Sequence, residues 1–122
     1  MSLSLEELEL CAFDPPHLGM PGWPCQAGRG EEEGRFVEIF VAVREGRIID
    51  VGFLTNIPGD GLVCASAYCN EVLQKTVEEA LALREQDILS LFPSPKREDV
   101  AVQDILRICV DAGVKSIGSC PP

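Results

Sequence analysis

The chain has 122 residues, of which 46% are hydrophobic and 25% charged, and its 20 acidic and 10 basic side chains give a net charge of -10. A chain of this length buries roughly two thirds of its unfolded surface, which is enough for one core, so residues 1–122 are predicted to form a single domain. The acidic balance repels phosphate backbones and anionic lipid, so we expect neither nucleic acid nor a membrane as a partner. No apolar run approaches the ~18 residues of a membrane helix. The first residues also lack the basic start of a secretory signal, which favours a cytoplasmic location.

Residues 11–34 are dominated by residues that interrupt regular structure, with four prolines, five glycines and an acidic run at 31–33. This density predicts a loop or arm. Its apolar side chains are expected to dock the arm on the domain, and they are Phe13, Leu18, Met20 and Trp23. His17 is the only histidine and also lies in the arm. A Cys–His nucleophile pair needs a third group to orient it, and none is evident, so no enzymatic activity is predicted.

The next segment predicts a β-hairpin over residues 35–55. Two runs rich in β-branched and aromatic residues, 35–43 and 48–55, are joined by a short polar turn that contains a glycine. One face of the hairpin is solidly apolar and the other only partly polar, so the hairpin needs helices to cover it.

Three helical stretches follow the hairpin. Apolar residues at helical spacing predict a helix over 62–75, a capping box at Thr76 opens helical structure over 77–91, and Ser94-Pro95 begins a last helix over 95–112. Residues 116–122 are expected to be a frayed tail. The predicted fold class is therefore α+β, with a small antiparallel sheet of two to three strands covered on one face by helices.

Several segments in a fixed order carry a family resemblance. They are GRIIDVGFLT at 46–55, a glycine-rich turn before CASA at 64–67, TVEEALAL at 76–83, and DIL at 87–89. Their order and spacing resemble the NifU/IscU family of iron-sulfur cluster assembly scaffolds, over a core of about residues 35–115. The resemblance implies an IscU-like fold and a protein without catalysis of its own. It also implies protein partners, namely a cysteine desulfurase and cluster acceptors or chaperones.

The family holds a transient [2Fe-2S] cluster with three cysteines, because soft thiolates ligate iron and tolerate cluster transfer. The resemblance places the three ligand positions of the family on Glu33, Pro58 and Asp99. No ligand cysteine is kept, so this chain departs from the family where the chemistry takes place.

Six cysteines are present, at 11, 25, 64, 69, 109 and 120, and without a secretory signal they are expected to be reduced. One hypothesis is a substitute iron or cluster site made by Cys64, Cys69 and Cys25, with Asp60 as an oxygen ligand and Cys11 as a further thiol. Cys64 is its first candidate because the start of a helix lowers a thiol pKa. The alternative is that these thiols simply pack, as predicted for Cys109 on the apolar stripe of the last helix.

Two functions follow from these observations. The first is a divergent scaffold-like protein that binds iron or an iron-sulfur cluster together with partner proteins. The second keeps the fold without the cluster and is an interaction or regulatory module whose acidic surface binds a basic partner. Zinc held by the same thiols for structural reasons is a further possibility.

Overall fold

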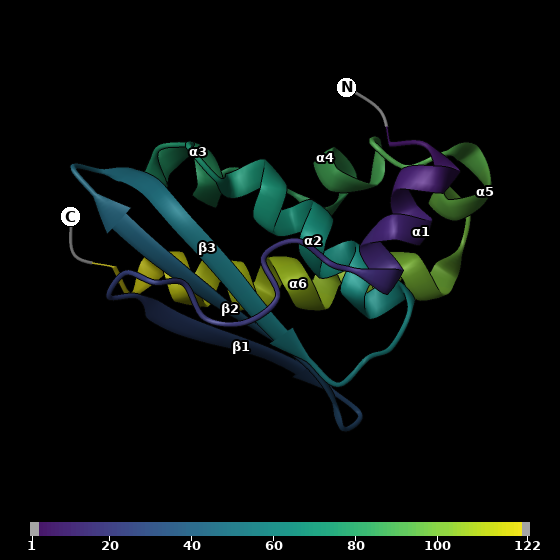
Figure 1. Cartoon of the computed structure of the whole chain (residues 1–122), viewed down its shortest axis with the longest axis horizontal. Coiled ribbons are helices and arrows are strands. Elements are labelled where there is room, and N and C mark those ends of the chain that lie inside the picture. The colour runs from purple at the N-terminus through teal and green to yellow at the C-terminus, as the bar shows by residue number, and fades with distance from the viewer. Residues whose placement is uncertain (1–2, 121–122) are drawn as a thin grey trace.

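The computed structural model describes residues 3–120 and confirms the α+β fold class (Figure 1). Its sheet has three antiparallel strands in the order β1-β2-β3. The strands are β1 (Gln26–Glu32), β2 (Arg35–Arg44) and β3 (Arg47–Thr55).

The predicted hairpin over 35–55 is confirmed as β2 and β3. Its turn residues Glu45 and Gly46 have φ angles of 54° and 75°. Positive φ at both central residues is the turn geometry that matches the twist of paired strands. A register shift at Ala42/Val43 bends the pair near this turn.

Six helices lie within the described residues: α1 (Leu5–Phe13), α2 (Asp60–Val72), α3 (Val77–Leu81), α4 (Glu85–Leu89), α5 (Ser94–Arg97) and α6 (Val100–Gly118). The predicted helix 62–75 is α2, whereas 77–91 divides into α3 and α4, and 95–112 into α5 and α6. Local caps cause these divisions, because the Asp87 side chain accepts from the backbone N–H of Arg84, and that of Asp99 accepts from Ala101 N–H. No helix in the described part of the chain is long and apolar enough to cross a membrane.

The prediction of a loop over residues 11–34 is wrong at both of its ends. A capping box between Ser4 and Glu7 starts α1, which continues to Phe13. At the other end, Gly28 and Gly30 are strand residues of β1. A Cβ at either position would strike backbone atoms of α6, so these glycines permit a close approach between strand and helix.

The predicted frayed tail is also wrong up to Gly118, because α6 continues to that residue. Ser116 and Ile117 are buried, and Ser116 Oγ donates a hydrogen bond of 2.7 Å to the carbonyl of Gln26. The last turns of α6 are therefore held against the start of β1. Residues 121–122 lie outside the described part of the chain.

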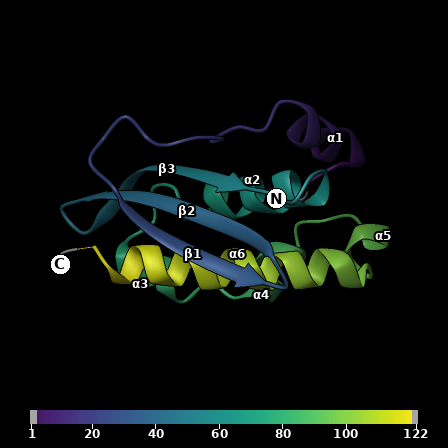
Figure 2. The ribbon, with the colours of Figure 1, turned by 90° about the horizontal axis from the view of Figure 1, so that it is seen from below.

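Residues 14–25 cross the molecule on the side opposite α6, together with α1 (Figure 2). The backbone holds this segment to β3, with hydrogen bonds from Gly19 N–H to Phe53 O (2.8 Å) and from Phe53 N–H to His17 O (3.0 Å). The expectation that apolar side chains dock the segment is wrong, because the four side chains in question are between 52% and 92% exposed: Phe13, Leu18, Met20 and Trp23.

A glycine-to-alanine pair tests the packing of β1 on α6. In Gly28→Ala the new methyl group meets the backbone of Ala112 and Ser116, so we expect a loss of about 1–3 kcal/mol in the free energy of unfolding. The control is Gly22→Ala, where the added Cβ has no neighbour within 4 Å and a change within about 0.5 kcal/mol is expected. Urea unfolding measures both, and equal stabilities would contradict the close approach.

Candidate functional site

The three positions that the sequence resemblance predicts for ligands, Glu33, Pro58 and Asp99, lie in three connections. Glu33 is in the turn between β1 and β2, Pro58 is in the loop between β3 and α2, and Asp99 is between α5 and α6. Figure 1 shows these three connections toward the same end of the molecule. Two hydrogen bonds tie the turn to the loop, from Phe36 N–H to Asn56 Oδ1 (2.8 Å) and from Asn56 Nδ2 to Gly34 O (2.9 Å). We call this end of the molecule the loop end.

None of the three residues at these positions supplies a soft ligand. Glu33 is exposed, with a φ of 54° that fits the tight turn, and Pro58 is exposed and has no side-chain donor atom. Asp99 caps α6, because its carboxylate accepts the backbone N–H of Ala101 at 2.9 Å. The carboxylate of Asp99 therefore already has a structural partner.

An ion pair occupies the loop end next to these positions. Lys96 Nζ of α5 lies 2.9 Å from Asp60 Oδ1 at the start of α2, and this hydrogen bond raises the pKa of Lys96. Both side chains are about one third exposed, so the pair contributes at most about 1 kcal/mol to stability. Its chemical consequence is larger, because Asp60 is engaged by a cation and Lys96 brings positive charge to the loop end.

Cys64 and Cys69 both lie on α2, but their sulfur atoms face different neighbours. Cys64 Sγ is 4.0 Å from the carbonyl of Val102 in α6, and Cys69 Sγ is 3.9 Å from the carbonyl of Gly52 in β3. Both side chains have 0% exposure. The structure therefore does not direct the two thiols toward a common point at the surface.

The pKa of Cys64 is raised, whereas a helix start was expected to lower it. Burial is the main cause, and the neighbouring Cys109 and Asp60 add to it. Burial also raises the pKa of Cys69. Loss of hydration outweighs any effect of the helix start at Cys64 and alone accounts for the shift at Cys69, so both groups are neutral thiols at pH 7.

Cys25 lies at the opposite end of the sheet from Glu33, because the seven residues of β1, roughly 23 Å long, separate them. There its neighbour is Cys120, whose sulfur is 3.9 Å from the carbonyl of Val41, the residue paired with Gln26. Cys25 is therefore not brought to Cys64. Within residues 3–120, no three His, Cys, Asp or Glu side chains are arranged to hold a metal ion.

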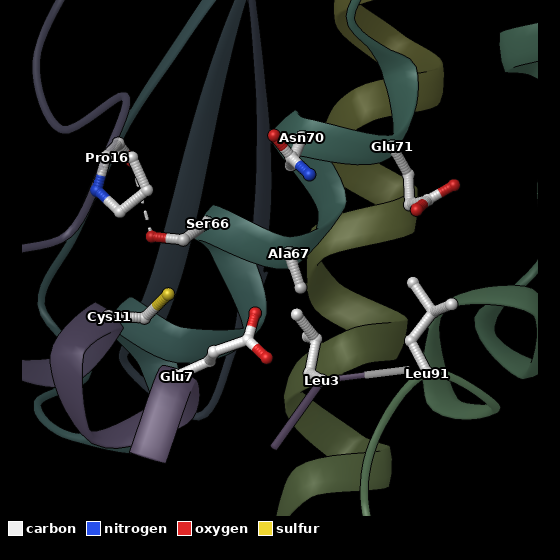
Figure 3. Close-up of a pocket in the computed structure, with 9 residues that line it drawn as sticks. All are labelled: Leu3, Glu7, Cys11, Pro16, Ser66, Ala67, Asn70, Glu71 and Leu91. Carbon is white, nitrogen blue, oxygen red and sulfur yellow. Dashed lines mark hydrogen bonds between the residues drawn. The ribbon is translucent and has the colours of Figure 1, made fainter. Parts of the chain in front are cut away.

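A pocket of about 250 Å³ lies between α1 and α2 (Figure 3). Leu3, Glu7, Cys11, Pro16, Ser66, Ala67, Asn70, Glu71 and Leu91 line it. Burial, followed by the nearby carboxylate of Glu7, raises the pKa of Cys11, which makes this thiol a poor nucleophile. Cys11 is the one cysteine that lines this pocket, and it belongs to no metal-binding group within residues 3–120.

Sequence reasoning missed this pocket because α1 was not predicted. The available signal was Ser4 followed three residues later by Glu7, the pattern of a capping box.

The burial of the thiols predicts two rates of labelling by an aromatic disulfide reagent at pH 8. Cys25 is half-buried and is expected to react promptly, whereas Cys64, Cys69 and Cys109 react only at the rate at which the protein opens. Mass spectrometry after timed quenching identifies the labelled residues. Prompt labelling of Cys64 would mean that this thiol is open to an incoming metal.

The same thiols predict that stability falls in alkaline solution. Because their folded-state pKa values are raised above about 8.5, only the unfolded chain releases these protons as the pH rises. Each thiol then removes up to about 1.4 kcal/mol of unfolding free energy per pH unit above pH 8.5. Urea unfolding between pH 8 and pH 10 measures the slope. Cys109→Ala should reduce the slope by the share of one thiol, and an unchanged slope would contradict this origin.

Comparison with known proteins gives matches to solved structures only, since no protein-family model and no curated protein matches the chain. A nitrogen-fixing NifU-like protein (N-terminal part) from Brucella abortus matches with a TM-score of 0.69 and 16% identity, over 91% of this chain and 89% of that one. A protein described as an iron-sulfur cluster assembly scaffold for the SUF system, from Fervidobacterium islandicum AW-1, matches with a TM-score of 0.70 and 12% identity, over 90% and 93%. A hypothetical protein matches with a TM-score of 0.58 and 20% identity, over 90% and 89%. The chain therefore has the fold of NifU-like and SUF-type scaffold structures, as the sequence resemblance predicted.

Proposed function

We propose that this protein is a non-catalytic, scaffold-like component of iron-sulfur cluster assembly that acts by binding protein partners and carries no cluster on its own thiols. The likeness of fold supports the link to cluster assembly. The observation that carries the cluster-free part is the loop end, where the Asp60–Lys96 ion pair and the side chains of Glu33, Pro58 and Asp99 stand in place of thiolates.

The chemistry of these donors argues against a cluster at the loop end. Iron in a cluster is held by soft, negatively charged thiolates, and the groups available there are carboxylates and a proline. Asp60 would have to give up Lys96, and Asp99 would have to give up the cap of α6. The ammonium group of Lys96 lowers the electrostatic attraction for a cation further.

A second candidate function keeps the cargo and binds iron or a [2Fe-2S] cluster at Cys64. The supporting observation is that Asp60 and Asp99 are the carboxylates whose charges act on this thiol. Zinc would use the same donors. This function needs an opening of α2 and α5 that exposes Cys64, and Cys69 and Cys25 cannot join without a larger rearrangement.

Anaerobic reconstitution with ferrous iron and sulfide separates the two functions. We expect less than about 0.1 iron per chain after desalting and no thiolate-to-iron absorption in the visible range, because the donor set lacks accessible thiolates. Stoichiometric iron and sulfide with visible absorption, lost in Cys64→Ser, would overturn the cluster-free proposal. Tight stoichiometric zinc that is lost in Cys64→Ser would instead assign these thiols a structural zinc site.

Restoring thiols at the loop end gives the converse prediction. The triple variant Glu33→Cys, Pro58→Cys, Asp99→Cys is expected to acquire a chromophore and iron on reconstitution. The support is that the three positions lie in the β1–β2, β3–α2 and α5–α6 connections and would then carry soft thiolates. The matched control has cysteines at exposed positions of α3 and α6, as Glu78→Cys, Asp111→Cys, Val114→Cys, and is expected to stay colourless. Circular dichroism checks that both variants fold. A folded but colourless triple variant would contradict the role of these positions.

The partner-binding part is tested with a purified cysteine desulfurase from the same organism. We expect a saturable complex by isothermal calorimetry. We also expect that no side chain of this protein takes part in the desulfurase reaction. Failure of the desulfurase to bind would overturn the proposed place in cluster assembly.

A further inference from the structure

Exposed apolar side chains are concentrated in the first part of the chain. Six of the ten large hydrophobic side chains that are exposed in the described residues belong to residues 5–23, and they are Leu5, Leu10, Phe13, Leu18, Met20 and Trp23. Phe13 is 92% exposed. Single exposed hydrophobics are ordinary, but a concentration of this kind in α1 and the segment after it indicates an interaction surface.

One face of α1 combines exposed apolar and acidic side chains at helical spacing. Glu6, Glu9, Leu10 and Phe13 occupy positions i, i+3, i+4 and i+7, so they lie on one face of the helix. Leu8, which is 3% exposed, lies on the other face and packs in the core. This exposed face therefore presents two apolar side chains, Leu10 and Phe13, next to two carboxylates, Glu6 and Glu9.

The same region is acidic throughout. Residues 1–28 contain four carboxylates and no lysine or arginine, and the first basic side chain with a permanent charge is Arg29. The carboxylates are Glu6, Glu7, Glu9 and Asp14. Lys96 is the cation that lines a pocket with Leu5 and Glu9, and it is already paired with Asp60. Apolar side chains beside these carboxylates favour a partner that presents apolar residues and positive charge together.

The helix α1 and residues 14–25 lie on one side of the molecule. Figure 2 shows α1 and residues 14–25 on the side of the molecule opposite α6, and hydrogen bonds to Phe53 hold the segment along β3. The backbone is thus anchored while Leu18, Met20 and Trp23 stay exposed. Aromatic residues and methionine are enriched in protein-binding surfaces, and this segment exposes both kinds of side chain on an anchored backbone.

We propose that the solvent-facing side of α1 and residues 14–25 form a docking surface for a basic amphipathic helix of a partner protein. This inference rests on the proposed partner-binding function and adds the surface and the chemistry of the partner. Leu10, Phe13 and Trp23 supply the apolar contacts, and Glu6, Glu9 and Asp14 pair with the lysine or arginine side chains that flank the apolar stripe of the partner helix.

The charge of the surface selects this occupant over two others. A second copy of the chain would bring Glu6, Glu9 and Asp14 against the same carboxylates, which like-charge repulsion disfavours. An anionic bilayer is repelled for the same reason. A basic helix gains apolar burial and charge neutralisation together.

The first experiment measures binding of a synthetic 18-residue helical peptide with leucine on one face and lysine on the other. Trp23, the only tryptophan, reports on the surface directly, and we expect its emission to shift to shorter wavelength and to titrate with a micromolar midpoint. A peptide with glutamate in place of lysine is expected to bind at least about 30-fold more weakly. Raising the salt from 50 to 500 mM should weaken the lysine peptide by about tenfold.

Matched surface variants test the location. Leu10→Ser with Phe13→Ser removes exposed side chains only, so the fold should be kept and affinity should fall at least tenfold. The control, Val100→Ser with Val114→Ser, removes two exposed apolar side chains of α6 and should leave affinity within twofold. Equal effects of both pairs would overturn the assignment.

Other outcomes are equally decisive. Concentration-dependent dimerisation abolished by Leu10→Ser with Phe13→Ser would assign the surface to a second copy. A shift of Trp23 emission with phosphatidylcholine vesicles but not with the peptide would assign it to a lipid surface. If the unmodified protein binds the desulfurase but not the lysine peptide, the docking surface is overturned and the proposed function stands. If it binds the lysine peptide but not the desulfurase, the proposed function is overturned and the docking surface stands.

Discussion

The close contact between β1 and α6 is the constraint on which the rest of the structure depends. Gly28 and Gly30 let the strand backbone meet the helix backbone, and the hydrogen bond from Ser116 to Gln26 holds the last turns of α6 in place. With α6 fixed along the sheet, α2 packs beside it and the buried thiols Cys64 and Cys109 fall into the core between these helices and the strands. This contact therefore fixes where the start of α6 lies relative to the β1–β2 turn, and so fixes the geometry of the loop end.

The charged side chains at the loop end are engaged by groups of the protein itself. The side chains of Lys96 and Asp60 satisfy one another there, and Asp99 satisfies the first turn of α6. Lys96, Asp60 and Asp99 therefore each have a structural partner within the protein, and binding a metal would require Asp60 or Asp99 to give up that partner. A cluster site needs soft ligand atoms that stay free to bind iron while neighbouring groups orient them.

The hairpin and the helices were predictable because their signals are local. The alternation in 35–55 and the helical spacing around Cys64 and Leu106 each reflect one buried face. β1 was not predictable in this way, because the role of Gly28 and Gly30 depends on a helix some 80 residues later in the chain. The same limit applied to the candidate site, since the separation of Cys25 from Cys64 is set by strand pairing and the burial of Cys64 by the packing of α6.

The attachment of residues 14–25 has a consequence for the dynamics of the chain. The segment is held by backbone hydrogen bonds at Phe53 and by the bond from Ser66 Oγ to Pro16 O at 3.3 Å, while its large side chains contribute little to the core. Opening such a segment breaks few bonds and exposes little new apolar area, so it requires much less free energy than global unfolding. Residues 14–25 can therefore detach and settle again while the sheet and α6 stay intact, which gives the molecule an adjustable edge on a rigid body.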